Sequence, residues 1–233
     1  MHSPPPLSPP ARRPFLITGA VCASLSLVLL VLVAARWSPL MSMDTSVAGA
    51  LHRRAVTEPG LVQVSRVLTD WVWDPWTMRL LTAVVVVALW WHGFRLVAGW
   101  VAATSLLTSL VQQGLKAAVG RERPRWIDPV DSAQYAAFPS GHAMTAAVTC
   151  GLLVWLLRLY GARPPLWWGS LVLAVISVTG VALTRVYLGV HWLSDVVGGI
   201  LMGVALASLS AAGYTEYTRR SRRPAGGGGG TPL

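Results

Sequence analysis

Long apolar segments follow one another along most of this chain, and they restrict its possible folds more than any other feature. The first segment, 15–35, contains only apolar and small polar side chains. At a rise of about 1.5 Å per residue, a helix of that length crosses a hydrocarbon layer of about 30 Å. Charged residues make up 12% of the chain, about half the share found in a soluble domain. Most of the chain is therefore expected to lie in lipid.

Five further segments have the composition of membrane-spanning helices. They cover residues 76–91, 96–119, 141–159, 166–183 and 190–212. The sequence predicts an all-α fold, a polytopic membrane protein with a six-transmembrane-helix bundle over residues 15–212. Gly199 and Gly203 form a small-residue pair that should let the last span pack closely on a neighbour. A cleavable signal peptide is the alternative for 15–35, although this apolar run is longer than a usual signal core.

The two ends of the chain differ in composition from the bundle. Residues 1–14 are rich in proline and end in a basic pair, whereas residues 213–233 are basic and then rich in glycine, so we expect two disordered tails. Six spans place both tails on one side, and their arginines favour the cytoplasmic side of the cell membrane. Segment 36–75 would then be an external loop, with a short amphipathic helix lying on the membrane. Asp74 and Pro75 would cap and begin the next span.

The formal net charge of +10 does not indicate a nucleic-acid-binding protein. Basic residues stand between apolar runs or at the chain ends, and they form no stripe interleaved with exposed aromatic residues. Cys22 and Cys150 lack the spacing of metal ligands, and no cluster of carboxylates could bind a divalent cation. We therefore expect no nucleic-acid partner, no metal and no cofactor. The sequence leaves the oligomeric state open.

Three polar clusters interrupt the apolar chain, each at a span end on the predicted external side. In the last cluster, His191 and Asp195 are four residues apart and would share a face of a helix. The carboxylate could accept the Nδ1 proton of the imidazole, which would leave Nε2 free as a nucleophile. Taken by itself, such a pair is more often a structural ion pair at a helix start.

The second cluster is Pro139-Ser140-Gly141-His142, at the start of a predicted helix. The amides of Ser140 and Gly141 and the Ser140 hydroxyl would point into an anion site. His142 could donate a proton to a leaving oxygen as a general acid. The structural alternative is a helix cap in which His142 faces water.

The first cluster supplies positive charge. Lys116 ends the third span, Arg123 follows in the next loop, and Arg185 adds a cation from a later segment. Three cations around one anion suit a phosphoryl group, whose charge is spread over its oxygens. The structural alternative is a set of basic side chains that extend to the membrane interface, and we assign Arg121 and Arg125 to that role.

Together the clusters resemble the signature of the type 2 phosphatidic acid phosphatase family, which shares its core with vanadium haloperoxidases. The matching motifs are K-x6-R-P at Lys116 to Pro124, P-S-G-H at Pro139 to His142, and R-x5-H-x3-D at Arg185, His191 and Asp195. The spacing within each motif is met without gaps. Thr184 stands where the third motif often has a serine. The resemblance covers residues 60–212.

The resemblance implies a role for each site residue. His191 would be the nucleophile that forms a phosphohistidine, Asp195 would orient it, and His142 would protonate the leaving group and then help to activate water. The residues that would hold the phosphate are Lys116, Arg123, Ser140, Gly141 and Arg185. No metal is implied.

The sequence thus predicts a metal-independent membrane phosphatase that hydrolyses a lipid phosphate or diphosphate at the outer membrane surface. Candidate substrates are phosphatidic acid, phosphatidylglycerol phosphate and polyprenyl diphosphate. The alternatives are a phosphotransferase to a sugar or lipid acceptor, a vanadate-dependent halide oxidase, and a non-catalytic membrane transporter. A transporter would need neither His142 nor His191, and both are present.

Overall fold

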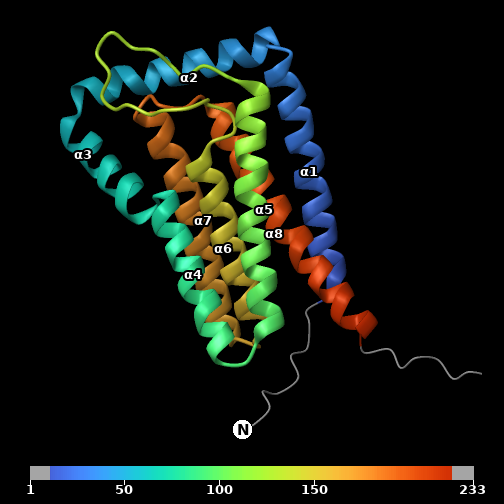
Figure 1. Ribbon diagram of the computed structural model, residues 1–233. Helices are drawn as coiled ribbons and strands as arrows, with labels where there is room; N and C mark the ends of the chain where they lie inside the picture. Colours follow the sequence, from blue (N-terminus) through green and yellow to red (C-terminus); the bar gives the residue numbers. More distant parts are fainter. Residues whose placement is uncertain (1–10, 222–233) are drawn as a thin grey trace, which may run out of the picture.

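The computed structural model describes residues 11–221, and most of these residues are helical (Figure 1). In chain order the helices are α1 (Arg12–Ala34), α2 (Ser38–Thr57), α3 (Pro59–Val67), the short π-helix η1 (Leu68–Val72), α4 (Pro75–Trp91), α5 (Arg95–Val119), α6 (Gly141–Leu159), α7 (Pro164–Tyr187) and α8 (Leu193–Ser221). Within the described residues, six helical stretches are long and apolar enough to cross a membrane. The prediction of an all-α, six-span protein is confirmed.

The second span is longer than the sequence suggested. The candidate span runs from Pro59 to Trp91, because α3 and η1 lead into α4. The predicted start of α4 is nevertheless confirmed. The Asp74 carboxylate accepts hydrogen bonds from the amides of Trp76 at 2.6 Å and Thr77 at 3.3 Å, so it satisfies two amides that a helix start leaves unpaired.

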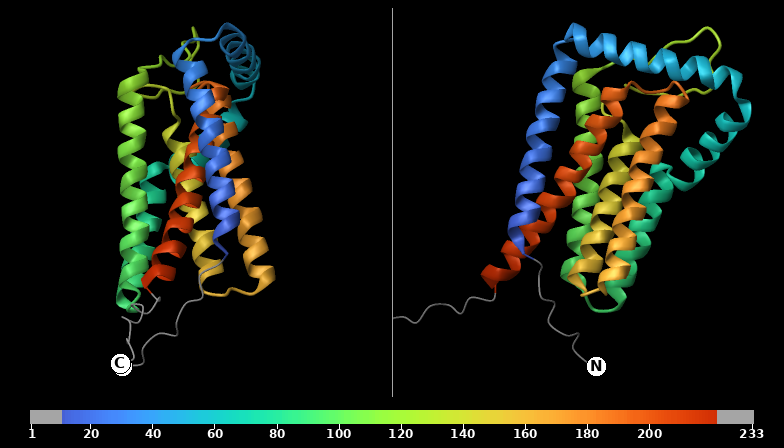
Figure 2. Two further views of the ribbon diagram at one scale, coloured as in Figure 1. Left: turned by 90° about the vertical axis from the view of Figure 1, so that its right-hand side faces the viewer. Right: turned by 180° about the vertical axis from the view of Figure 1, so that it is seen from behind.

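Helix α2 lies across one end of the bundle (Figures 1 and 2). Its buried stripe repeats every three or four residues, as one face of a helix does: Leu40, Asp44, Ala48, His52 and Ala55. The expectation of a loop with a short helix at 36–75 is wrong in this respect, because α2, α3 and η1 occupy nearly all of that segment. An aspartate and a histidine in the buried stripe lower its mean hydropathy. The segment therefore lacks the long apolar run by which the other helices can be recognised.

The last span packs closely on two other helices. Helix α8 runs beside α1 and α6 (Figure 2). A Cβ added at Gly199 would lie 2.6 Å from the Ser140 carbonyl oxygen, and one at Gly203 would lie 2.7 Å from that of Met144. The prediction of close packing at this glycine pair is confirmed, and it fixes the start of α6 against α8.

Both described ends of the chain lie at the end of the bundle opposite α2 (Figure 1). There, Arg12 in α1 lies 3.7 Å from Glu216 in α8. The predicted disordered tails were too long, because residues 12–14 and 213–221 are helical and continue the spans. The remainder of each predicted tail, 1–10 and 222–233, lies outside the described residues.

Candidate active site

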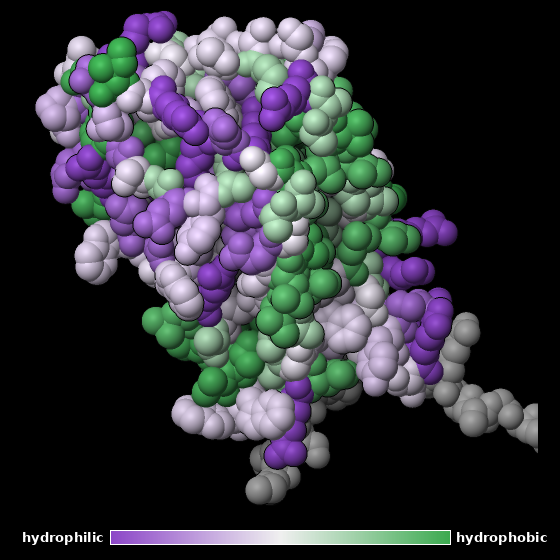
Figure 3. Space-filling model, turned by 45° about the horizontal axis from the view of Figure 1, so that its top comes forward, coloured by the Kyte–Doolittle hydropathy of each residue, from purple (hydrophilic) through white to green (hydrophobic). Residues whose placement is uncertain are grey.

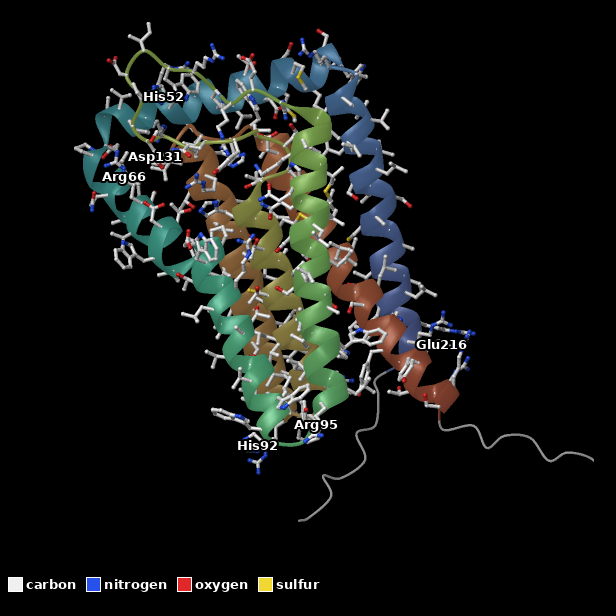
Figure 4. The ribbon with its side chains drawn as sticks, in the orientation of Figure 1. His52, Arg66, His92, Arg95, Asp131 and Glu216 are labelled. Carbon is white, nitrogen blue, oxygen red and sulfur yellow. The ribbon has the colours of Figure 1, made fainter. Side chains whose placement is uncertain are left out.

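The predicted site residues meet at the end of the bundle that α2 crosses. They come from the end of α5, the loop after it, the start of α6, the end of α7, and the turn and first residues of α8: Lys116, Arg123, Ser140, Gly141, His142, Arg185, His191 and Asp195. Figure 4 marks this end by Asp131 and Arg66, and the opposite end by His92 and Arg95. Segments far apart in sequence are brought together, as the six-span topology requires.

His191 and Asp195 form a buried pair. The Nδ1 atom of His191 lies 3.3 Å from Oδ2 of Asp195, and the two side chains are 1% and 0% exposed. The expectation that they share a helix face is wrong, because α8 begins at Leu193 and His191 lies in the preceding turn. Gly189, with φ +70°, allows that turn. The Asp195 Oδ2 atom also accepts a hydrogen bond from the Trp192 amide at 2.9 Å.

The other imidazole nitrogen of His191 faces a guanidinium group. Its Nε2 atom lies 3.1 Å from Nη1 of Arg123. A guanidinium can only donate, so Nε2 accepts and the ring proton belongs on Nδ1, toward Asp195. Burial and the charges of Arg123, Arg185 and Lys116 hold the pKa of His191 well below its usual range. The imidazole is therefore neutral, with its lone pair on Nε2.

Arg123 is held in place by backbone carbonyl groups. It donates to the carbonyl oxygens of Tyr135 at 2.9 Å, Gln134 at 3.0 Å and Val190 at 2.6 Å. Burial and the neighbouring Arg185 lower the pKa of Arg123 to about 10, so its guanidinium stays charged at neutral pH. The contact with His191 is thus made by a cation whose position is fixed from three directions.

The segment 124–138, called here the 124–138 loop, supplies acceptors to the other two predicted phosphate-binding cations as well. Lys116 donates to the carbonyl oxygen of Ala136. Nη1 of Arg185 lies 4.0 Å from an Asp131 oxygen of the loop and 3.9 Å from an oxygen of Asp70 in η1. All three cations therefore face this loop, whose acceptors compete with any anion that binds them.

The start of α6 offers one free hydroxyl to the site. Ser140 Oγ is buried and has no hydrogen-bond partner within the described residues. The Ser140 amide, which we expected to face the anion, instead donates to the Asp195 carbonyl oxygen at 3.0 Å. Half-buried His142 lies within electrostatic reach of His191 and Arg185. A Cβ added at Gly141 would lie 2.7 Å from Nε2 of Gln112.

Gln112 is a site neighbour that sequence reasoning missed. It lies on α5 one turn before Lys116, is buried, and has no partner for its Oε1 atom within the described residues. A buried amide inside an apolar span is itself a signal of a functional position. As for a metal, no three His, Cys, Asp or Glu side chains gather into a ligand set among residues 11–221.

Arg121 does not extend to the membrane interface, so that assignment was wrong. Its side chain is 10% exposed and donates to Asp195 Oδ1 and to Asp44 Oδ2, both at 2.6 Å. Arg125 fits the assignment better, being 83% exposed and 3.2 Å from Glu122. The contact with Asp44 joins residues 77 positions apart, which no local pattern could indicate.

Three comparisons with known proteins give related results. The PAP2 superfamily model matches residues 97–219. Phosphatidylglycerophosphatase B of Bacillus subtilis (strain 168) is 34% identical over 116 residues, which cover 49% of this chain and 56% of that protein. The matched stretch thus spans just over half of the relative's length. A crystal structure of a transmembrane PAP2 type phosphatidylglycerolphosphate phosphatase from Bacillus subtilis superposes with a TM-score of 0.74 and 25% identity, over 86% of this chain and 98% of that one.

Replacing Asp131 by Asn should strengthen anion binding, because the carboxylate competes for Arg185. We expect the dissociation constant for orthovanadate to fall about twofold to fivefold, the scale of one partly exposed ion pair. Isothermal titration calorimetry on the purified protein measures it. Asp128→Asn removes the same charge from an exposed position on the same loop and should leave the constant unchanged. Weaker binding in Asp131→Asn would contradict the competition.

Proposed function

Because the chain belongs to the PAP2 superfamily, we propose that it is a membrane phosphatase that hydrolyses a lipid phosphate or diphosphate through a phosphohistidine on His191. The proposal depends on the hydrogen bonds of the two ring nitrogens of His191. Its neutral Nε2 faces the cationic site, and its Nδ1 proton points to a buried carboxylate. When a phosphate draws the Arg123 guanidinium away from Nε2, that arrangement presents a lone pair to phosphorus and stabilises the positive charge that develops on the ring.

In the first step, the substrate phosphate replaces the loop acceptors at Lys116, Arg123 and Arg185. The negative charge it brings also favours the protonated form of His142. Nε2 of His191 then attacks phosphorus, and the bond from phosphorus to the ester oxygen breaks. The leaving oxygen takes the electron pair of that bond and the proton of His142. Asp195 accepts the Nδ1 hydrogen bond of the phosphorylated ring throughout.

In the second step, a water molecule hydrolyses the phosphohistidine. Neutral His142 accepts a proton from the water as its oxygen attacks phosphorus. The bond between phosphorus and Nε2 breaks, and its electron pair returns to His191. Inorganic phosphate leaves, and His142 again carries the proton with which the cycle began. The Ser140 hydroxyl, buried and without a partner within the described residues, can donate to a phosphate oxygen in both steps.

A lipid substrate is supported by the surroundings of the site. Hydrophilic side chains gather at the site end, and hydrophobic ones cover the flank of the bundle (Figure 3). Between α4, α6 and α7 lies an apolar cavity of about 580 Å³, lined from Thr149 to Tyr160 along α6. Thr149 follows His142 by seven residues, about 10 Å along a helix. A lipid whose headgroup occupies the site could therefore place one hydrocarbon chain in this cavity.

Among the candidate substrates, phosphatidylglycerol phosphate is favoured over phosphatidic acid and polyprenyl diphosphate. The support is the similarity to a relative and to a solved structure, both from Bacillus subtilis, whose names specify that substrate. We also propose that the site faces outward from the cell membrane. The opposite end of the bundle carries arginines at both described chain ends, Arg12, Arg13, Arg219 and Arg220, and such residues collect on the cytoplasmic side.

Replacing His191 by Ala should abolish phosphate release while the protein stays folded. We expect turnover of phosphatidylglycerol phosphate to fall by more than about 1000-fold, because no other group would supply the nucleophile. His92→Ala, at the opposite end of the bundle (Figure 4), is the matched control and should keep full activity. Phosphate release by purified protein, with thermal unfolding as a folding check, measures both. Unchanged turnover in His191→Ala would refute the mechanism.

The proposed reaction uses no metal ion, so chelation should not affect it. We expect the same rate of phosphate release with and without EDTA in the assay buffer, because lysine and arginine side chains supply the charge that neutralises the phosphate. The panel should compare phosphatidic acid, phosphatidylglycerol phosphate and polyprenyl diphosphate. A loss of activity in EDTA that added Mg²⁺ restores would contradict the metal-free mechanism.

Filling the apolar cavity should separate lipid substrates from soluble ones. Leu153 lines the cavity on α6, and Leu153→Trp would occupy space that a hydrocarbon chain needs. We expect KM for diacyl lipid substrates to rise about tenfold, the scale of lost burial for two methylene groups, with KM for p-nitrophenyl phosphate unchanged. Leu106→Trp, on an exposed position of α5, is the control. Equal effects on both substrates would argue against the cavity as a chain site.

A further inference from the structure

Helix α2 reaches the catalytic pair through a buried chain of charges. Arg121 bridges two carboxylates, with 2.6 Å from Nη1 to Asp195 Oδ1 and 2.6 Å from Nη2 to Asp44 Oδ2. Asp44 lies on the buried stripe of α2 and, like Asp195, is 0% exposed. Carboxylates buried to this degree are strongly destabilising unless they are paired and hydrogen-bonded. The chain of contacts therefore fixes all three groups.

Ser194 closes this network. Its amide donates to Asp44 Oδ1 at 2.9 Å, its hydroxyl donates to Asp44 Oδ2, and the same hydroxyl oxygen accepts from Arg121 Nη1 at 2.7 Å. Because Ser194 precedes Asp195 in the first turn of α8, these bonds also fix the backbone beside the carboxylate. Both oxygens of Asp44 are thus occupied by donors from the site itself.

The net charge of the network matters for the reaction. If Arg121 alone faced Asp195, their charges would cancel and little negative potential would remain at His191. With Asp44 as a second partner, two carboxylates share one guanidinium, and one net negative charge remains. That charge sits beside a ring that becomes cationic when Nε2 bonds to phosphorus, and it is worth more in a dry site than in water.

We propose that Asp44 and Arg121 are positioning residues for the phosphoryl-transfer reaction. Arg121 fixes the Asp195 carboxylate against His191, and Asp44 keeps the network negative. The inference rests on the proposed function. It goes beyond the family match, which begins at residue 97 and so leaves out α2. Helix α2 is then part of the site, because it carries one of the charges on which the nucleophile depends.

The other charged groups that face His191 make this negative charge necessary. Arg123 comes from the loop after α5, Lys116 from α5, and Arg185 from α7, and each acts on His191 as a positive charge. His142 faces it from α6. A cationic phosphohistidine among these groups would be unstable without compensation. The phosphate offsets part of the charge, and the network of Asp44, Arg121 and Asp195 offsets part from the opposite side of the ring.

The test compares Asp44→Asn and Arg121→Lys with wild-type protein. Asn keeps the shape of Asp44 but loses its charge, and Lys keeps the charge of Arg121 but cannot bridge two carboxylates. We expect kcat to fall about 10-fold to 100-fold in each, the range for partners of a functional group, with KM within about twofold. Glu216→Gln is the control, because Glu216 pairs with Arg219 and Arg220 at the opposite end.

A second measurement needs no turnover. Proton NMR of selectively ¹⁵N-histidine-labelled protein resolves the Nδ1 proton of His191, assigned by its loss in His191→Gln. Its resonance should move upfield in both variants, since Asp195 becomes a weaker or displaced acceptor, and should not move in Glu216→Gln. A merely structural role would lower the melting temperature without moving this resonance. Should Asp44→Asn fail to fold, Ser194→Ala replaces it, with kcat expected to fall about threefold to tenfold at unchanged KM.

The outcomes separate the inference from the proposed function. An unchanged kcat, an unchanged Nδ1 resonance, or losses that Glu216→Gln shares in proportion to its melting temperature would each overturn the inference. If wild-type protein releases phosphate and the variants behave like it, the function stands and the inference fails. If wild-type protein releases no phosphate from any lipid tested but the resonance moves as described, the proposed function fails, and what stands is that the network sets the strength of Asp195 as an acceptor for His191.

Discussion

Charge buried at one edge of the membrane is the constraint on which the rest of this structure depends. An ionised side chain withdrawn from water must be paired and hydrogen-bonded, or it neutralises. Here four cations, Lys116, Arg121, Arg123 and Arg185, lie at the same end of an apolar bundle as the carboxylates of Asp44 and Asp195, which are fully buried. Each group has a protein partner, and α2 and the 124–138 loop, which supply several of those partners, are elements that leave the simple six-helix pattern.

The 124–138 loop and helix α2 lie on different sides of His191 and have different roles. The 124–138 loop faces the cations that would hold phosphate, and it supplies mainly neutral carbonyl oxygens, which a charged anion can replace. Helix α2 faces the carboxylate side and supplies the ionised Asp44. If Asp44 moved away, the buried Arg121 would lose one of its two ion-pair partners. The contacts of the loop can be exchanged for contacts with an anion, whereas the contacts of α2 are permanent. This difference follows from the chemistry of the partners, whatever the identity of the lipid.

The sequence predicts the parts of this protein that lipid dictates. A spanning helix must be long and apolar, so all six spans could be located, and motif spacing brought Lys116, His142 and His191 to one end. What escaped prediction depends on long-range contacts. Arg121 resembled an interface residue because its partner Asp44 lies 77 positions away, in a helix whose buried stripe is partly polar. His191 was expected on α8, but the turn at Gly189 makes the same contact without a helix.

The contact between Arg123 and His191 links substrate recognition to the reactivity of the proposed nucleophile. Nε2 of His191 accepts from a guanidinium that also donates to three carbonyl groups, so Arg123 occupies its lone pair. For Nε2 to attack phosphorus, the substrate must draw Arg123 away from it. An ionised phosphate does this better than any neutral headgroup, because its hydrogen bonds are charge-assisted. Neutral lipids, which surround the protein, would leave the hydrogen bond between Arg123 and Nε2 of His191 in place. Under the proposed mechanism, selection for phosphate would therefore begin at a contact of the residue that attacks phosphorus.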